Sequence, residues 1–154
     1  MKVTVFGSGY VGLVTAACLA DAGNPVVCVD ISATRIERLD AGELPIYEPG
    51  LDGLIRRNRE AGRLTFTADA ATGARHGLCQ LIAVGTPADE NGSADVSHVL
   101  TVARTIGEHL TEYAVLITKS TVPVGTAGRV RAEVAAALAR RGVAVEFDVV
   151  SNPE

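Results

Sequence analysis

Hydrophobic and polar residues follow two alternating patterns along the chain, which together predict short buried strands separated by helices. Strands are predicted over residues 3–6, 25–29, 64–67, 78–84, 114–118 and 143–150, and the run 78–84 is apolar except for Gln80. Between these runs the apolar residues recur at helical spacing, as Val99, Ala103 and Ile106 do. Uninterrupted apolar runs are typical of strands in a parallel sheet, because both faces of such a sheet are covered.

Helix start and stop residues divide the sequence between the predicted strands. We expect helices over residues 13–22, 32–39, 51–59, 69–74, 95–110 and 126–141. Strand and helix therefore alternate along residues 1–154, with no linker that would split the domain. Right-handed crossovers between parallel strands then give a Rossmann-type doubly wound α/β sheet with the strand order 3-2-1-4-5-6.

A glycine pattern that indicates a phosphate site follows the first predicted strand. Gly7, Gly9 and Gly12 have the spacing G-x-G-x-x-G and lie between this strand and the first helix. Gly7 permits a tight turn, and Gly12 permits close packing of helix on strand. Gly9 has no Cβ, so a diphosphate can approach the backbone there. The amide groups at the start of the helix would then face the phosphates.

An acidic residue follows the second predicted strand. Asp30 comes after Gly12 at close to the spacing of about 20 residues that is typical of a ribose-binding acid. Its carboxylate can accept hydrogen bonds from both ribose hydroxyls and would repel a 2′-phosphate, which favours NAD over NADP. Alternatively, Asp30 only caps the next turn together with Ser32. Arg35 lies on that turn and either contacts the adenosine side or is solvated.

Other polar loops also follow predicted strands. Thr86 and Pro87 follow the fourth strand, residues 119–121 follow the fifth, and residues 152–154 follow the sixth. Ligands of open parallel sheets bind outside the carboxyl ends of the strands, so we expect a dinucleotide and a second reactant at this edge. On the residues alone, Thr86 could equally be a turn residue and Thr121 a helix-entry residue.

Composition narrows the class of protein. Hydrophobic residues make up 47% of the chain and the formal net charge is −4. This suits a globular domain with an aliphatic core, and since no basic stripe is present it argues against a nucleic-acid partner. No apolar run is long enough to span a bilayer, and the chain starts with a strand rather than a signal peptide. We therefore expect a cytoplasmic protein with no membrane partner.

The cysteines do not have the spacing of a metal site, and we expect no metal. Cys18, Cys28 and Cys79 fall in the first helix, the second strand and the start of the fourth strand. We expect buried, reduced thiols at all three positions. A thiol in an apolar core is a poor nucleophile, because desolvation raises its pKa. His98 falls outside the apolar stripe of its helix, so we expect it to be exposed.

Six strings of the sequence carry a family resemblance. In order, they are GSGYVGL, PIYEPGL, VGTP, GSADVSHV, KSTVPVGT and SNPE. Together they resemble the amino-terminal NAD-binding domain of the UDP-glucose 6-dehydrogenase family, which extends to GDP-mannose and UDP-N-acetylmannosamine dehydrogenases. The resemblance covers essentially the whole chain. The forms PIYEPGL and VGTP are more similar to the UDP-glucose members.

The resemblance implies an enzyme that oxidises C6 of UDP-glucose to give UDP-glucuronate, in two hydride transfers to two NAD. It implies a cysteine thiolate that holds the aldehyde as a thiohemiacetal and then as a thioester, which water hydrolyses. Thr121 would help to order this water, and Glu154 would lie beside the reacting sugar. The implied cofactor-binding residues are Gly7, Gly9, Tyr10, Val11, Gly12, Asp30, Arg35, Thr86 and Thr121.

The family's nucleophilic cysteine comes from a region beyond residue 154. The resemblance therefore implies a fragment that binds NAD but does not oxidise UDP-glucose by itself, without the central and C-terminal substrate domains. It also implies that the full-length enzyme is a homodimer. The alternatives are a GDP-mannose or UDP-N-acetylmannosamine dehydrogenase, a non-catalytic nucleotide-binding module and, remotely, a methyltransferase that binds S-adenosylmethionine.

Overall fold

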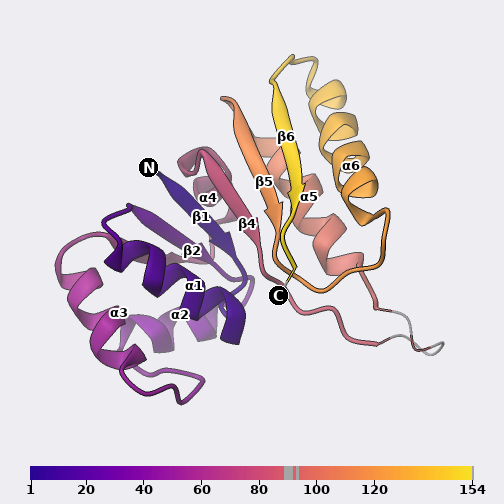
Figure 1. The fold of residues 1–154 in the computed structure, drawn as a ribbon. Coiled ribbons are helices and arrows are strands. Elements are labelled where there is room, and N and C mark those ends of the chain that lie inside the picture. The colour runs from indigo at the N-terminus through magenta and orange to yellow at the C-terminus, as the bar shows by residue number, and fades with distance from the viewer. Residues whose placement is uncertain (89–91, 93, 154) are drawn as a thin grey trace.

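The strands form one parallel sheet in the predicted order (Figure 1). The computed structural model describes residues 1–88, 92 and 94–153. Within this part of the chain the sheet has six strands in the order β3-β2-β1-β4-β5-β6. Their bounds are β1 Val3–Phe6, β2 Val26–Val29, β3 Leu64–Thr67, β4 Cys79–Ile82, β5 Ala114–Thr118 and β6 Phe147–Ser151.

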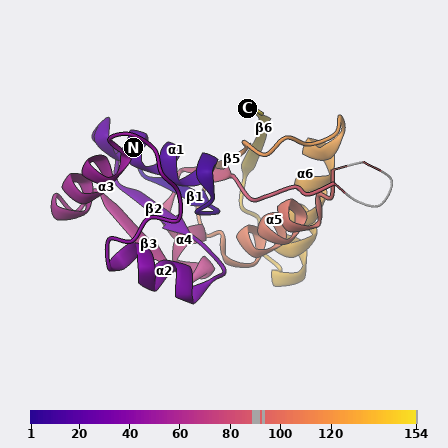
Figure 2. The same ribbon diagram turned by 90° about the horizontal axis from the view of Figure 1, so that it is seen from below.

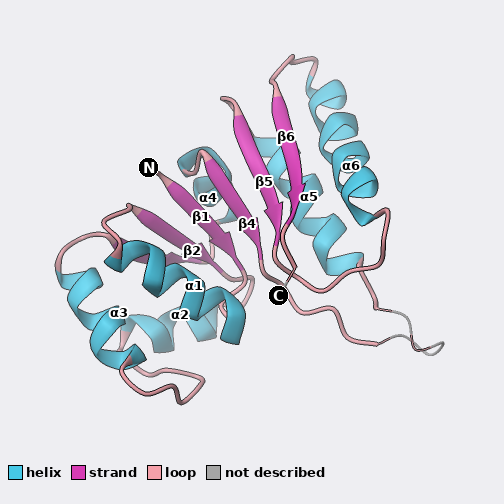
Figure 3. Cartoon of the chain, viewed as in Figure 1, coloured by secondary structure: helices cyan, strands magenta, loops and turns pink. Residues whose placement is uncertain are grey.

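Helices connect the strands (Figure 3). Their bounds are α1 Tyr10–Asp21, α2 Ala33–Asp40, α3 Leu51–Glu60, α4 Ala70–His76, α5 Ser97–His109 and α6 Thr126–Arg141. Ser32 caps α2 by accepting a hydrogen bond from the Arg35 amide, and Asp69 caps α4 by accepting one from the Ala71 amide. The fold is therefore the predicted Rossmann-type doubly wound α/β sheet.

Three strands are shorter than predicted: β2 by one residue at its start, and β4 and β6 by more, because strand length depends on pairing. Ala114 at the start of β5 pairs with Phe147, so residues 143–146 extend beyond β5 and have no neighbouring strand there. Phe6 at the end of β1 pairs with Ile82, after which the chain turns away at Gly7. Residues 83–84 are therefore outside β4 although they are apolar.

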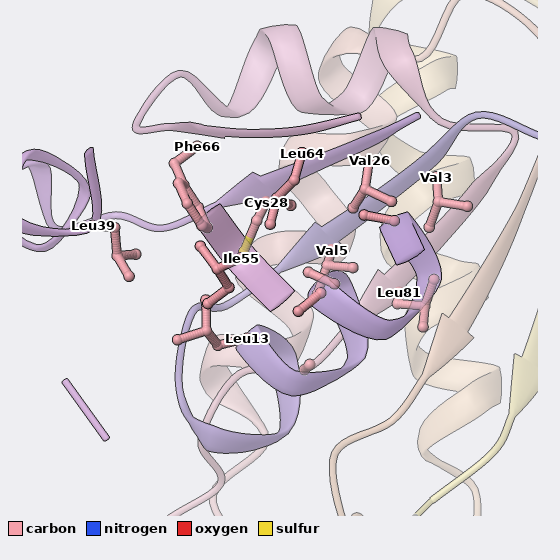
Figure 4. Close-up of a cluster of buried hydrophobic side chains, with 14 of the residues drawn as sticks. Val3, Val5, Leu13, Val26, Cys28, Leu39, Ile55, Leu64, Phe66 and Leu81 are labelled. Atoms are coloured by element: carbon pink, nitrogen blue, oxygen red, sulfur yellow. The ribbon is translucent and has the colours of Figure 1, made fainter. Parts of the chain in front are cut away.

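Both faces of the sheet are covered by apolar side chains, which alternate along the strands with a period of two. One cluster lies between the sheet and α1, α2 and α3 (Figure 4), and includes Val3, Val5, Leu13, Val26, Cys28, Leu39, Ile55, Leu64, Phe66 and Leu81. The other lies between the sheet and α4, α5 and α6, and includes Phe6, Val27, Val29, Ala74, Ile82, Ile106, Leu116 and Val134.

The carboxyl ends of the strands meet at one edge of the sheet, which Figure 2 views from below. At one end of the sheet α1 and α3 lie side by side, and at the other end α5 and α6 do so. The loops after β1, β2, β4 and β5 come together at this edge between the two helix pairs. Among the described residues, no helix combines the length and apolar character that a membrane span needs.

The prediction of three buried thiols was wrong for two of them. Cys28 is buried, but Cys18 is exposed and Cys79 is only partly buried. Cys18 lies on the outer side of α1, opposite Leu13, Ala17 and the other residues that face the core. Cys79 lies at the amino end of β4, where its Sγ is 3.6 Å from Sδ of the exposed Met1.

A matched pair of valine truncations tests this core. Val5 is fully buried between β2 and β4, whereas Val124 is fully exposed in the loop before α6. Val5→Ala removes two buried carbons and leaves a small cavity, so we expect the free energy of unfolding to fall by roughly 2 kcal/mol. Val124→Ala should leave it unchanged. Urea denaturation followed by circular dichroism measures both, and equal effects would contradict the assignment of the core.

Candidate functional site

The turn between β1 and α1 is packed so closely that two of its glycines cannot be replaced without a clash. Gly7 has φ of +105°, and its amide donates to the Val29 carbonyl at 2.8 Å. A Cβ on Gly7 would lie 2.6 Å from the Ala83 carbonyl oxygen, and a Cβ on Gly12 would overlap the carbonyl oxygen of Gly7. These contacts fix the start of α1 against β1 and β4.

Gly9 faces open space, in contrast to the closely packed Gly7 and Gly12. Its backbone is extended, with φ of −71° and ψ of −171°, and a Cβ placed there would meet no other atom within 4 Å. The space beside Gly9 is therefore open, and it lies at the amino end of α1. Amide groups at a helix start carry partial positive charge, so this cradle fits an anionic phosphate.

A cavity of about 510 Å³ extends from this cradle along the carboxyl edge of the sheet. Gly7 and Gly9 line one end of it, and Asp30 and Arg35 line its side. The remaining wall is mostly apolar and includes Val29, Ala68, Ala70 and Val102. An apolar slot with a few polar groups is typical of a site for a nucleotide, in which the flat base needs apolar contact.

Asp30 is buried at the end of β2 and accepts hydrogen bonds on both oxygens. Its Oδ2 accepts from the Ser8 amide at 3.0 Å and the Ser8 hydroxyl at 2.6 Å, and its Oδ1 accepts from the Ser32 amide at 3.0 Å. Burial by itself would raise the pKa of Asp30. Hydrogen bonds from Ser8 and Ser32 and the charge of Arg35 outweigh it, so the pKa lies below the usual value. The carboxylate therefore stays ionised at neutral pH.

The two interpretations of Asp30 turn out to be compatible. The Ser32 amide bond is the turn cap that the sequence suggested, yet the same carboxylate lines the cavity. Arg35 also lines the cavity: its Nη1 lies 3.3 Å from Oδ2 of Asp30, while 45% of its side chain is exposed. A guanidinium that is so exposed can move to meet a ligand.

The loops after β4, β5 and β6 are tied to one another. The Thr86 hydroxyl donates to the Thr121 carbonyl at 3.0 Å, and the buried Ser120 hydroxyl donates to the Val84 carbonyl at 2.6 Å. Lys119 Nζ donates to Oδ1 of Asn152 at 3.3 Å. Thr86 and Thr121 therefore lie together at the carboxyl edge, beyond the residues that line the cavity. Glu154 lies outside the described residues.

Three residues expected in the cofactor site, Tyr10, Val11 and Gly12, belong to α1 itself. Tyr10 and Val11 form its first turn and are not among the residues that line the cavity. The Tyr10 hydroxyl donates to Oε2 of Glu48 at 2.9 Å, which joins the start of α1 to the loop over residues 41–50. Of the predicted cofactor residues, Gly7, Gly9, Asp30 and Arg35 line the cavity itself.

Sequence reasoning missed one wall of the cavity. His98, Thr101, Val102 and Thr105 of α5 line it, and Nδ1 of His98 lies 3.4 Å from the carbonyl oxygen of Gly85. His98 is exposed, as predicted, but it is exposed towards this cavity. The sequence does indicate that these four residues share a surface, because their spacing i, i+3, i+4, i+7 places them on one face of the helix, beside the core stripe.

Comparison with known proteins gives the family. Residues 1–154 match the UDP-glucose/GDP-mannose dehydrogenase family, NAD binding domain. The UDP-glucose 6-dehydrogenase of Pseudomonas aeruginosa is 52% identical over 154 residues, which are 100% of this chain and 34% of that protein. The chain belongs to the UDP-glucose/GDP-mannose dehydrogenase family. It spans about a third of the length of this curated relative.

Solved structures of family members have the same fold. A UDP-glucose dehydrogenase from the archaeon Pyrobaculum islandicum is 40% identical, with a TM-score of 0.88 over 99% of this chain and 35% of that one. A GDP-mannose dehydrogenase from Pseudomonas aeruginosa, solved as a ternary complex, is 37% identical, with a TM-score of 0.91 over 100% of this chain and 36% of that one. The predicted family and fold are confirmed, and NAD is the cofactor of this family domain.

The contrast between the glycines gives a test of the cradle. Gly9→Ala is compatible with the extended backbone at that position, so the protein should keep its melting temperature. The new methyl group would occupy the space that the cofactor phosphates need, and NAD⁺ affinity should fall by more than about tenfold. Titration calorimetry measures the affinity.

Gly12→Ala is the comparison variant, because its methyl group meets the Gly7 carbonyl instead of open space. We expect a loss of stability of roughly 3 kcal/mol, which thermal unfolding measures. If Gly9→Ala were the variant that unfolds, or if it bound NAD⁺ normally, the open cradle would be wrongly placed.

Proposed function

We propose that Gly7, Gly9 and Gly12 form the diphosphate site of NAD⁺ and that Asp30 and Arg35 hold its adenosine end. The observation that carries this proposal is that Asp30 and the open space beside Gly9 belong to one cavity. The carboxylate is ionised, so it can accept hydrogen bonds from the ribose hydroxyls. It would repel a 2′-phosphate at the same place.

Thr86 and Thr121 extend this proposal towards the nicotinamide. They are joined by a hydrogen bond at the carboxyl edge, next to Gly85 and the cavity. When bound there, NAD⁺ would accept the hydride removed from the substrate alcohol. In the proposed enzyme, Thr121 would help to order the water of the hydrolytic step, and Glu154 would face the sugar. Buried Ser120 would hold Thr121 in place, since its hydroxyl donates to the carbonyl of Val84, just after β4.

We propose UDP-glucose as the substrate of the enzyme to which this domain belongs. Identity supports this choice, at 52% to a UDP-glucose 6-dehydrogenase against 37% to a GDP-mannose dehydrogenase. GDP-mannose and UDP-N-acetylmannosamine are the alternatives within the family. The residues that discriminate between bases and sugars would lie outside 1–154, and so would most of the contacts to the second copy of the expected homodimer.

The nucleophilic cysteine is proposed to lie outside residues 1–154. Burial raises the pKa of the Cys28 thiol to about 12, which leaves almost no thiolate at neutral pH. Cys79 lies at the amino end of β4, on the edge opposite the cofactor cavity, and Cys18 points outward from α1. All three cysteines are unpaired, which supports the reducing cytoplasm as the proposed location.

Cofactor selectivity tests the role of Asp30. We expect NAD⁺ to bind in a calorimetric titration and NADP⁺ to bind roughly 100-fold more weakly, because its 2′-phosphate would lie against the carboxylate. Asp30→Ala should weaken the binding of NAD⁺ by about 10- to 100-fold, since charge-assisted hydrogen bonds to the ribose are lost. It should also narrow the difference in affinity between NAD⁺ and NADP⁺.

Asp52→Ala provides the control for that titration. Asp52 is an exposed carboxylate at the start of α3, outside the cofactor cavity, so its loss should change neither affinity. Equal binding of NAD⁺ and NADP⁺ by the unchanged protein would refute the assignment of Asp30.

The location of the nucleophile has a separate test. A polypeptide of residues 1–154 should bind NAD⁺ but produce no NADH from UDP-glucose, because the residues that bind the sugar nucleotide are proposed to lie outside it and none of its thiols lies at the carboxyl edge to carry the aldehyde into a second hydride transfer. Absorbance at the NADH wavelength, with a full-length relative as the positive control, measures this. Sustained turnover by residues 1–154 would show that the chemistry needs no further segment.

A further inference from the structure

Ser8 is the unassigned residue within the glycine pattern, and it is fully buried. Its backbone amide and its side-chain hydroxyl both donate to the same oxygen, Oδ2 of Asp30, at 3.0 and 2.6 Å. The hydroxyl bond is short, as is typical when the acceptor is charged. Ser8, in the turn between β1 and α1, therefore donates two hydrogen bonds to the carboxylate that is proposed to bind the ribose.

The two oxygens of this carboxylate are used unequally. Oδ2 accepts from the amide and hydroxyl of Ser8 and lies 3.3 Å from Nη1 of Arg35. Oδ1 accepts from the Ser32 amide. An ionised carboxylate offers about four acceptor positions, two on each oxygen. With Oδ2 engaged by the protein, Oδ1 is the oxygen with remaining capacity for a ligand in the cavity.

We propose that Ser8 is a positioning residue for the cofactor: it holds Oδ2 of Asp30 against the phosphate turn and so directs Oδ1 to the adenosine ribose. This inference rests on the proposed function of Asp30 and names the residue on which that function depends. It also makes the diphosphate cradle and the ribose-binding acid a single hydrogen-bonded unit rather than two neighbouring sites.

The turn can transmit this constraint because its own geometry is fixed. The Gly7 amide donates to Val29, and the Gly7 carbonyl oxygen lies 3.8 Å from Sγ of buried Cys28 and against Gly12. The peptide between Gly7 and Ser8 therefore has one orientation, which directs the Ser8 amide at Asp30. Alanine at position 8 would keep this amide bond and remove only the hydroxyl bond.

The hydroxyl bond also affects the charge of the carboxylate. Ser8 is the largest of the influences that lower the pKa of Asp30 against the opposing effect of burial, followed by the Ser32 amide and Arg35. Two other titratable groups lie near Asp30: His98 lines the same cavity, and Cys28 lies beneath the glycine turn. Since ionised Asp30 is the form that binds ribose, NAD⁺ affinity should fall as pH drops through its pKa. Loss of the Ser8 hydroxyl raises that pKa and moves the fall to higher pH.

A calorimetric titration of NAD⁺ with matched variants tests the proposal. We expect Ser8→Ala to lower the affinity about tenfold at neutral pH and to shift its acid limb to higher pH. Ser8→Thr keeps the hydroxyl and should restore both. Thr4→Val is the control, because the Thr4 hydroxyl is equally buried and donates to the Gly73 carbonyl at 2.8 Å, away from the cavity. It should lower the melting temperature but leave the affinity and its pH dependence unchanged.

A double-mutant cycle separates positioning from general damage to the fold. In an Asp30→Ala background there is no carboxylate for Ser8 to position, so adding Ser8→Ala should cost no further affinity. An equal loss from Ser8→Ala in both backgrounds would overturn the proposal. So would a Ser8→Ala variant that behaves like Thr4→Val. Failure of the unchanged protein to bind NAD⁺ would instead refute the proposed function, and this inference with it.

Discussion

The site depends on the close approach of three backbone segments where β1 passes into α1. A Cβ on Gly7 would come within 2.6 Å of the Ala83 carbonyl oxygen, and one on Gly12 would overlap the Gly7 carbonyl. Only a chain without side chains at these positions can bring the start of α1 so close to β1 and β4. Between these two closely packed glycines, the space beside Gly9 is open.

The buried carboxylate of Asp30 is the second feature on which the arrangement depends. A buried carboxylate is unfavourable unless hydrogen bonds and charge compensate, and here the phosphate turn supplies most of that compensation through Ser8. The sheet holds this turn in place, because the Gly7 amide donates a hydrogen bond to the carbonyl of Val29 at the end of β2. Fold and candidate site therefore share the same interactions.

Strand order, the glycine turn and the place of Asp30 beside it were predictable because each follows from local sequence: short apolar segments, residue spacing, and crossover handedness. The features that were missed depend on partners far away in the sequence. The start of β6 is set by its pairing with Ala114, and the exposure of Cys18 by which face of α1 meets the sheet. The role of His98 in the cavity wall depends on how α5 lies over the carboxyl edge, and its helical spacing alone could not give that.

Hydrogen bonds connect the loops of the carboxyl edge beyond the cavity. Thr86 is bonded to Thr121, Ser120 to the carbonyl of Val84, and Lys119 to Asn152, so the loops after β4, β5 and β6 form one connected rim. Transfer between two reactants requires a fixed distance between them, and a rim of this kind can hold one reactant still while the other is presented. The thiols do not share this edge, since Cys28 is sealed beneath the glycine turn and Cys79 lies at the amino end of β4. The backbone packing that builds the glycine turn is therefore also the packing that buries Cys28.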